Sequence, residues 1–247
     1  MHIPDGFVDA PTSLAFGAVA AAGVGLCLRG ARRELDERTA PMAGLVAAFV
    51  FAVQMMNFPV AAGTSGHLLG GALAAILVGP WTGALCVTVV LAVQALFFAD
   101  GGVSAIGLNV TNMALVTAAV AWAAFWLLRK VLPRTRSSVL AATFVAALVS
   151  VPVSALAFVG QYAVGGTADI PLAATTTAMV GIHVLIGIGE AAITTLTVGS
   201  VLSVRPDLVF GARDLVPELS LSATGPQGPA APASASAAST PAAPSTT

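Results

Sequence analysis

Charged residues are scarce in this sequence. Asp, Glu, Lys and Arg make up 9% of its 247 residues, whereas hydrophobic residues make up 57%. The single lysine, Lys130, follows no glycine-rich loop, so the sequence lacks the P-loop lysine that binds ATP phosphates. The net charge of −1 and the lack of a basic patch with interleaved aromatic residues argue against nucleic acid as a partner. We therefore expect no ATP hydrolysis by that route, and any ATP-driven activity would need partner subunits.

Cysteine is rare as well. Cys27 and Cys86 both lie within apolar segments, so we expect them to be small buried hydrophobic residues. Two such cysteines indicate neither a disulfide framework nor a cysteine metal site.

Long apolar runs dominate what is present, and the mean hydropathy is +0.93. A membrane-spanning helix needs about 20 largely apolar residues, fewer where neighbouring helices share the depth. The sequence therefore predicts an all-α, polytopic protein of the cell inner (plasma) membrane with about seven transmembrane helices. They are expected at 12–28, 41–56, 67–79, 81–98, 104–129, 137–160 and 171–204. The uncharged turn Gly79-Pro80-Trp81 separates the third from the fourth, or kinks one longer helix.

The ten cations fall into three clusters, residues 29–38, 129–136 and 205–213. With seven spans all three clusters lie on one side, whereas six spans would place two of them on the opposite side. The positive-inside rule assigns that side to the cytoplasm. We therefore expect the N-terminus outside and the C-terminus inside.

Three regions follow from this topology. Residues 1–11 would form a metal-binding N-terminal loop, 12–205 a transmembrane helical domain, and 206–247 a cytoplasmic tail. From about residue 220 the tail consists of Ala, Pro, Ser and Thr, which are too poor in large apolar residues to form a core, so we expect disorder there.

The N-terminus Met1-His2-Ile3-Pro4-Asp5-Gly6-Phe7 has no cation ahead of an apolar run, unlike a secretory signal peptide, so we expect it to be retained. The amine of Met1, the deprotonated amide nitrogen of His2 and the His2 imidazole can form fused five- and six-membered chelate rings around one ion. Three nitrogens in a plane suit Ni(II), Cu(II) or tetragonal Co(II), whereas zinc prefers a tetrahedron. A fourth ligand is needed.

His67 is the candidate fourth ligand. Thr64 or Ser65 is a plausible N-cap for the third helix, which would place His67 in its first turn, where the helix dipole favours a neutral imidazole. Hydrogen bonds that orient these ligands could come from four polar residues near the outer surface: Asn57, Ser65, Asn109 and Asn112. Ordinary hydrogen bonding between helices would explain the asparagines equally well. His183 and Glu190 lie deeper on the last helix, so we expect a structural or coupling role for them.

Several of these stretches together resemble the cobalt/nickel substrate-binding subunits, of the CbiM/NikM type, of energy-coupling factor (ECF) transporters. They are residues 1–7, Gln54 to Gly71, Gly79-Pro80-Trp81, Asp100-Gly101-Gly102 and Gly187-Ile188-Gly189-Glu190-Ala191. The resemblance covers about residues 1–205. It implies that Met1, His2 and His67 hold Co(II) or Ni(II) in a square plane, as transported cargo and not as a permanent cofactor.

The resemblance also implies partners: a transmembrane coupling subunit, two cytoplasmic ATPase subunits and a small accessory membrane protein, expected here as a separate chain. The choice between cobalt, for example for cobalamin biosynthesis, and nickel stays open, because the same nitrogens suit both ions.

A second hypothesis is a rhomboid-like intramembrane serine protease. Gly63-Thr64-Ser65-Gly66 matches the GxSG pattern, and His183 would serve as the base for Ser65. In those enzymes glycine follows the histidine at three residues, whereas Gly187 follows His183 at four. The protease hypothesis also leaves residues 1–7 unexplained.

Overall fold

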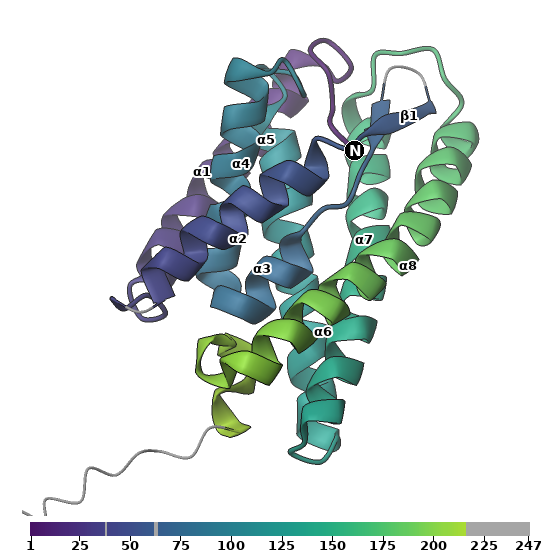
Figure 1. The fold of residues 1–247 in the computed structure, drawn as a ribbon. Helices are drawn as coiled ribbons and strands as arrows, with labels where there is room; N and C mark the ends of the chain where they lie inside the picture. The colour runs from purple at the N-terminus through teal and green to yellow at the C-terminus, as the bar shows by residue number, and fades with distance from the viewer. Residues whose placement is uncertain (38, 62–63, 216–247) are drawn as a thin grey trace, which may run out of the picture. The chain divides into compact units, whose positions relative to one another are not determined.

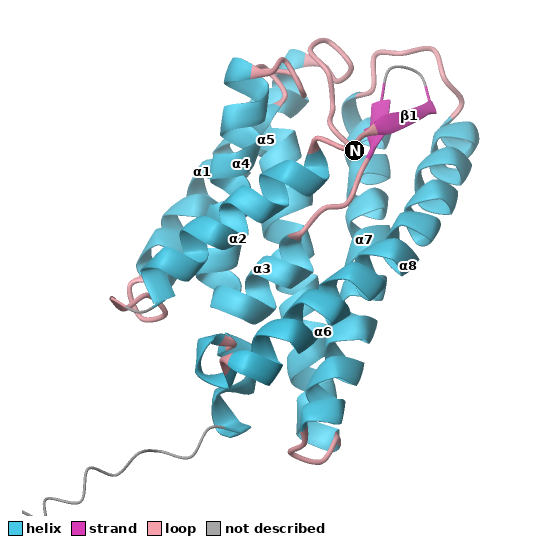
Figure 2. Cartoon of the chain, in the orientation of Figure 1, coloured by secondary structure: helices cyan, strands magenta, loops and turns pink. Residues whose placement is uncertain are grey.

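The computed structural model describes residues 1–37, 39–61 and 64–215, with the backbone alone at 58–61 and 64–65, and consists mainly of helices (Figures 1 and 2). The long helices are α1 (Ala10–Ala31), α2 (Thr39–Gln54), α4 (Pro80–Phe97), α6 (Thr117–Val131), α7 (Arg136–Gly165) and α8 (Leu172–Val204). The shorter ones are α3 (Gly71–Val78), α5 (Ile106–Asn109), the π-helical η1 (Val110–Val116), and the 3₁₀ turns η2 (Pro206–Leu208) and η3 (Phe210–Leu215).

Five apolar helical stretches in the described residues are long enough to cross a membrane. They are α1, α4, the continuous run Ile106–Val131 through α5, η1 and α6, and then α7 and α8. The apolar helix α2 is shorter, at 16 residues. These lengths confirm a multi-pass membrane protein.

Local sequence explains where these helices begin. The Asp9 carboxylate accepts a hydrogen bond of 2.8 Å from Thr12 N and caps α1, and Pro11 occupies the first turn. Gly79, with a φ of 98°, separates α3 from α4, and Pro80 starts α4. The predicted turn at Gly79-Pro80-Trp81 is therefore a helix boundary.

The three cation clusters gather at one end of the bundle, the lower end in Figure 1. Arg29 and Arg33 line the same cavity as Arg213, which lies in η3. Arg129, at the end of α6, forms an ion pair of 2.7 Å with Asp214, which lies in η3 beside Arg213. This arrangement is the one predicted from the distribution of charge.

The expected helix over 67–79 is wrong in its first part. Helix α3 begins at Gly71 after Gly70, whose φ is 75° and where a Cβ would collide with Val50. Thr64 and Ser65 are therefore not its N-cap, and His67 is not in its first turn. Non-helical backbone is tolerated at this depth because buried side chains satisfy it: Gln54 Nε2 donates to Leu69 O at 2.7 Å.

A strand pair is the second departure from the all-α prediction. β1 (Phe58–Ala61) and β2 (Thr64–Gly66) run antiparallel, with Phe58 opposite Gly66 and Pro59 opposite Ser65. At the other end of the bundle, residues 206–215 do not form an extended tail, because Val209 and Ala212 are fully buried. The disorder predicted from about residue 220 lies outside the described residues.

Candidate metal centre

The N-terminal segment is buried, although it precedes the first helix. Met1, His2 and Ile3 are 0%, 4% and 1% exposed. Figure 1 shows the N-terminus near one end of α7 and beside the strand pair, not projecting from the bundle. A free chain end loses much conformational entropy on such burial, so specific contacts must hold it.

Asn109 of α5 holds Ile3 by both backbone groups. Its Oδ1 accepts from Ile3 N at 2.7 Å, and its Nδ2 donates to Ile3 O at 3.1 Å. Gly102 N also donates to Ile3 O, at 2.8 Å. A Cβ at Gly102 would collide with Asp5, so glycine is needed for this approach. The segment is thus fixed against the loop that joins α4 to α5.

The same loop and the end of α7, with the residues just after it, hold the part of the segment that follows Ile3. Asp5 Oδ1 accepts from Ser104 N at 2.8 Å and from Ser104 Oγ at 2.5 Å. These bonds hold the pKa of the Asp5 carboxyl below its usual value. On the other side, Thr167 N donates to Phe7 O at 3.1 Å, and Asp9 N donates to Gly165 O at 2.7 Å.

His2 and His67, 65 positions apart in the sequence, lie against each other with ring centroids 4.6 Å apart. His67 is 1% exposed, and its Nδ1 lies 2.8 Å from Leu68 O. A carbonyl only accepts, so Nδ1 carries the proton and Nε2 keeps its lone pair. No hydrogen-bond partner for Nε2 is found among the described residues. His67 therefore offers the kind of nitrogen that a metal ion needs.

Asp100 is the anionic neighbour of this pair. Its Oδ1 lies 3.2 Å from His2 Nδ1, and its Oδ2 accepts from Asn57 Nδ2 at 3.2 Å. Burial raises the pKa of the Asp100 carboxyl, but the contacts with His2 and Asn57 outweigh burial and bring this pKa below its usual value. The site thus has a fixed negative charge beside its nitrogens.

Burial also keeps two of the nitrogens neutral. It lowers the pKa of the Met1 amine to about 4, against an opposing effect of Asp100. It likewise lowers the pKa of His67 well below its usual value, with the nearby N-terminus and His2 adding to the effect. Near pH 7 both groups are unprotonated and have lone pairs available to a cation.

Glu190 of α8 is a residue of this region whose role sequence reasoning left undecided. Its Oε2 accepts from Leu69 N at 2.5 Å and its Oε1 accepts from Gly70 N at 2.9 Å. The side chain is 2% exposed. It therefore fixes the backbone that directly follows His67. The signal available in the sequence was a lone carboxylate within an apolar helix.

The remaining predicted residues lie elsewhere or are not described. Asn112 is fully buried, but its Nδ2 donates to Gln161 Oε1 at 2.6 Å, a contact between η1 and α7. The Ser65 side chain lies outside the described residues. His183 is buried in α8, with Nδ1 2.7 Å from Met179 O.

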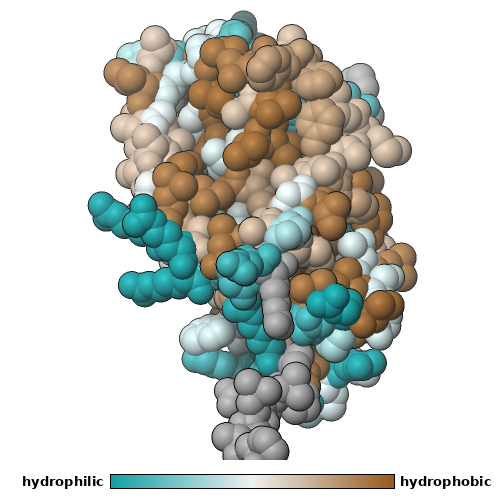
Figure 3. Space-filling view, turned by 60° about the vertical axis from the view of Figure 1, so that its left-hand side comes forward, coloured by the Kyte–Doolittle hydropathy of each residue, from teal (hydrophilic) through white to brown (hydrophobic). Residues whose placement is uncertain are grey.

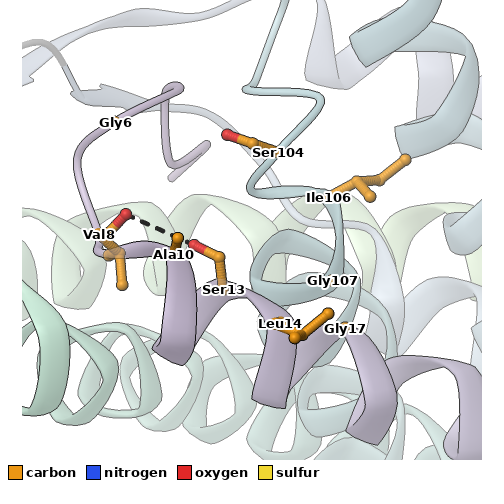
Figure 4. A pocket seen from close by; sticks show the side chains of 9 residues that line it. All are labelled: Gly6, Val8, Ala10, Ser13, Leu14, Gly17, Ser104, Ile106 and Gly107. Atoms are coloured by element: carbon orange, nitrogen blue, oxygen red, sulfur yellow. Dashed lines mark hydrogen bonds between the residues drawn. The ribbon is translucent and has the colours of Figure 1, made fainter.

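An open cavity of about 570 Å³ lies beside the N-terminal segment (Figure 4). Gly6 and Val8 line it together with Leu14 of α1 and with Ser104 and Ile106. Neither Met1 nor His2 is among its lining residues. Met1 and His2 are themselves buried, so this cavity does not expose their nitrogens.

Comparison with known proteins agrees with this arrangement. The CbiM family model, described as a cobalt uptake substrate-specific transmembrane region, matches residues 2–208. A protein of Haloquadratum walsbyi named as a metal transport protein is 39% identical over 210 residues, which cover 85% of this chain and 94% of the relative. A protein of Archaeoglobus fulgidus named as a fused nickel transport protein, NikMN, is 38% identical over 210 residues, covering 85% of this chain and 68% of the relative.

A crystal structure of a truncated transition metal transporter superposes on this chain with a TM-score of 0.75 at 29% identity, covering 82% of this chain and 99% of the other. None of these comparisons supports the protease hypothesis. The chain belongs to the CbiM family and is a membrane component of metal transport.

Proposed function

We propose that this chain is the substrate-binding subunit of an ATP-driven ECF-type importer of Co(II) or Ni(II). Four nitrogens bind the ion: the Met1 amine, the His2 amide nitrogen, His2 Nδ1 and His67 Nε2. The observation that carries the proposal is the enclosure of Met1, His2 and His67 in one place, with the His67 Nε2 lone pair unused among the described residues.

Binding requires one rearrangement. His2 Nδ1 faces Asp100 at 3.2 Å, so chelation by Nδ1 replaces this contact with the metal ion. The ion brings two positive charges, and the deprotonated His2 amide offsets one of them. The Asp100 carboxylate offsets the other, which matters because an uncompensated charge is costly in a buried site.

The choice of metal follows from the donor set. The chelate rings of residues 1 and 2 place three nitrogens in one plane, and His67 completes a square. This geometry suits Ni(II) and tetragonal Co(II) and disfavours tetrahedral Zn(II). The cobalt-uptake family model and the relative named for nickel transport support the same two ions.

Metal analysis tests this site directly. The purified protein is exposed to equal concentrations of Co(II), Ni(II) and Zn(II), desalted and analysed for bound metal. We expect one equivalent of nickel or cobalt in the wild type and far less in His67→Ala. Zinc as the only bound metal would contradict the planar site.

The coupling to ATP is tested by uptake into cells. The sequence lacks a P-loop lysine, so we expect uptake only with a coupling subunit, two ATPase subunits and a small accessory membrane protein. In the cell membrane the chain has its N-terminus outside and its C-terminus in the cytoplasm, in line with the cations at one end. Uptake of nickel or cobalt at the full rate by this chain alone would refute the ATP-driven scheme.

A further inference from the structure

Two adjoining cavities lie on the α1 side of the molecule. The first, of about 380 Å³, is formed by α1, α4, η1 and α6 and has an apolar lining. Gly23 of α1 and Ala84 of α4 lie at its wall, together with Leu115 and Trp122. A Cβ at Gly23 would collide with Leu115, so this glycine sets how closely α1 approaches η1.

The second cavity, of about 400 Å³, has a cationic lining. Arg29 comes from the last turn of α1, Arg33 from the turn that follows it, and Arg213 from η3. Leu26 and Trp81 line both cavities, so the two lie next to each other. The volumes are in the range of ordinary ligand pockets.

The positive charge of this second cavity is not balanced from within. Its acidic residue, Glu34, is 6% exposed and accepts hydrogen bonds from Thr82 N at 2.7 Å and Trp81 N at 3.3 Å. The Glu34 carboxylate is thus directed at the start of α4. In the described part of the chain, no carboxylate lies within ion-pair distance of Arg29, Arg33 or Arg213. An anionic ligand would supply the missing charge.

The position of the cavities relates them to the membrane. Only 17% of the apolar window of α1 is buried inside the protein. Figure 3 brings forward the side of the molecule that lies on the left in Figure 1. On this side the upper part is mainly hydrophobic, and hydrophilic residues gather at the lower end. Trp81, which is 45% exposed, lies where the two cavities meet, as tryptophan does at a membrane interface.

We propose that this pair of cavities binds one anionic phospholipid. The headgroup phosphate contacts Arg29, Arg33 and Arg213, and an acyl chain occupies the apolar cavity beside Trp81 and Trp122. A phospholipid fits both parts because it joins an anion to an apolar chain. Basic pockets between membrane helices recognise lipid headgroups in this way. This site is separate from the metal centre and does not depend on the proposed function.

The test uses tryptophan emission from the site. Trp126→Phe leaves Trp81 and Trp122 as the tryptophans of the chain. This protein, in neutral detergent, is titrated with phosphatidylglycerol or phosphatidylcholine that carries brominated acyl chains, which quench tryptophan on contact. We expect half-maximal quenching at an at least tenfold lower concentration of phosphatidylglycerol than of phosphatidylcholine.

Charge variants show whether the arginines cause this preference. Arg29→Gln, Arg33→Gln and Arg213→Gln together should reduce it to less than twofold. The matched control, Arg32→Gln with Arg134→Gln and Arg136→Gln, loses the same charge at exposed positions that line neither cavity and should keep it. If the triple variant does not fold, Arg33→Gln alone should lower the preference at least threefold.

Three results would overturn the proposal. The first is equal quenching by the two lipids in the Trp126→Phe protein, and the second is a preference that survives the arginine changes. The third is displacement of phosphatidylglycerol by inorganic phosphate at the same concentration, which would make the site a simple anion site. Equal quenching by the two lipids, together with loss of partner-subunit binding in the arginine variant, would identify the pair of cavities as a protein contact instead.

Discussion

Replacing Glu190 by glutamine tests whether α8 positions His67, the proposed metal ligand. Glutamine keeps one acceptor oxygen, but its amide NH₂ faces either Leu69 N or Gly70 N, which the carboxylate binds at 2.5 and 2.9 Å. Leaving one buried N–H without an acceptor costs about 1–3 kcal/mol, and the remaining bond loses its charge assistance, about 1 kcal/mol more. If about 2 kcal/mol of this cost is a loss of metal-binding free energy, the metal affinity falls about 30-fold.

The assay is Ni(II) affinity by isothermal titration calorimetry, at a temperature where circular dichroism shows the variant folded. Thr194→Val, buried in the same helix one turn further on, is the matched control and should bind as the wild type does. A variant that melts earlier but binds Ni(II) within twofold of the wild type would refute a positioning role. Glu190 would then contribute to stability alone.

Three further predictions concern the nitrogens and the segment that carries them. His67→Ala should weaken Ni(II) binding at least tenfold, about 1.4 kcal/mol, with unchanged abundance in the membrane, and normal binding would exclude His67 as a ligand. Asn109→Ala leaves Ile3 N without its acceptor, at a cost of about 1–3 kcal/mol, whereas Ile3 O keeps its bond from Gly102 N; Ile3 amide hydrogen exchange and metal release should both accelerate. The logarithm of the Ni(II) affinity should rise by about one per pH unit between about pH 7 and about 8, because binding releases one proton, from the His2 amide. The buried Met1 amine, with its pKa of about 4, is already unprotonated and releases none. A slope near two would mean that the amine titrates at its solvent value of about 7.7–8.0 and that the metal-free segment is exposed.

The sequence predicted the membrane class and the arrangement of charge well, because both depend on composition along the chain. Apolar runs of sufficient length specify helices in lipid whatever they pack against. The end of α1, the end of α6 and η3 lie at one end of the bundle because the number of helices between them returns the chain to the same side of the membrane, so no tertiary contact had to be known. Asn57 and Asn109 were expected near the N-terminal loop, and both lie there through Asp100 and Ile3.

The segment before α3 could not be predicted in the same way. Residues 67–70 are apolar apart from His67, so local pattern favours a helix. Their non-helical backbone is stable because Gln54 and Glu190, 15 and 120 or more positions away, satisfy its polar groups. Likewise Asn112 differs from Asn109 only in the partner that the fold presents, Gln161 in place of Ile3. Such long-range pairs are visible only after folding.

The low pKa of the Met1 amine is another property that the residue type does not reveal. From reference values alone, affinity would fall steeply below neutral pH as both the amine and the imidazoles gained protons. Burial lowers the pKa values of the amine and of His67, so protons do not compete with a metal ion for these two nitrogens near neutral pH. Both groups are therefore already unprotonated at neutral pH, as the proposed metal site requires. At pH 7 keeping the amine neutral costs about 1.4 kcal/mol relative to a solvent-exposed amine with a pKa of 8.0.

The most direct test of the metal site is to block the first nitrogen of the chain. One residue added before Met1, or acetylation of Met1, converts the amine into an amide, and Met1 is 0% exposed, so the addition also lacks space. Ni(II) and Co(II) affinities are measured for this form, for the wild type and for a control that lacks residues 221–247. We predict at least 100-fold weaker binding for the blocked form and wild-type binding for the control. Full binding by the blocked form would exclude the amine as a ligand and contradict the four-nitrogen site.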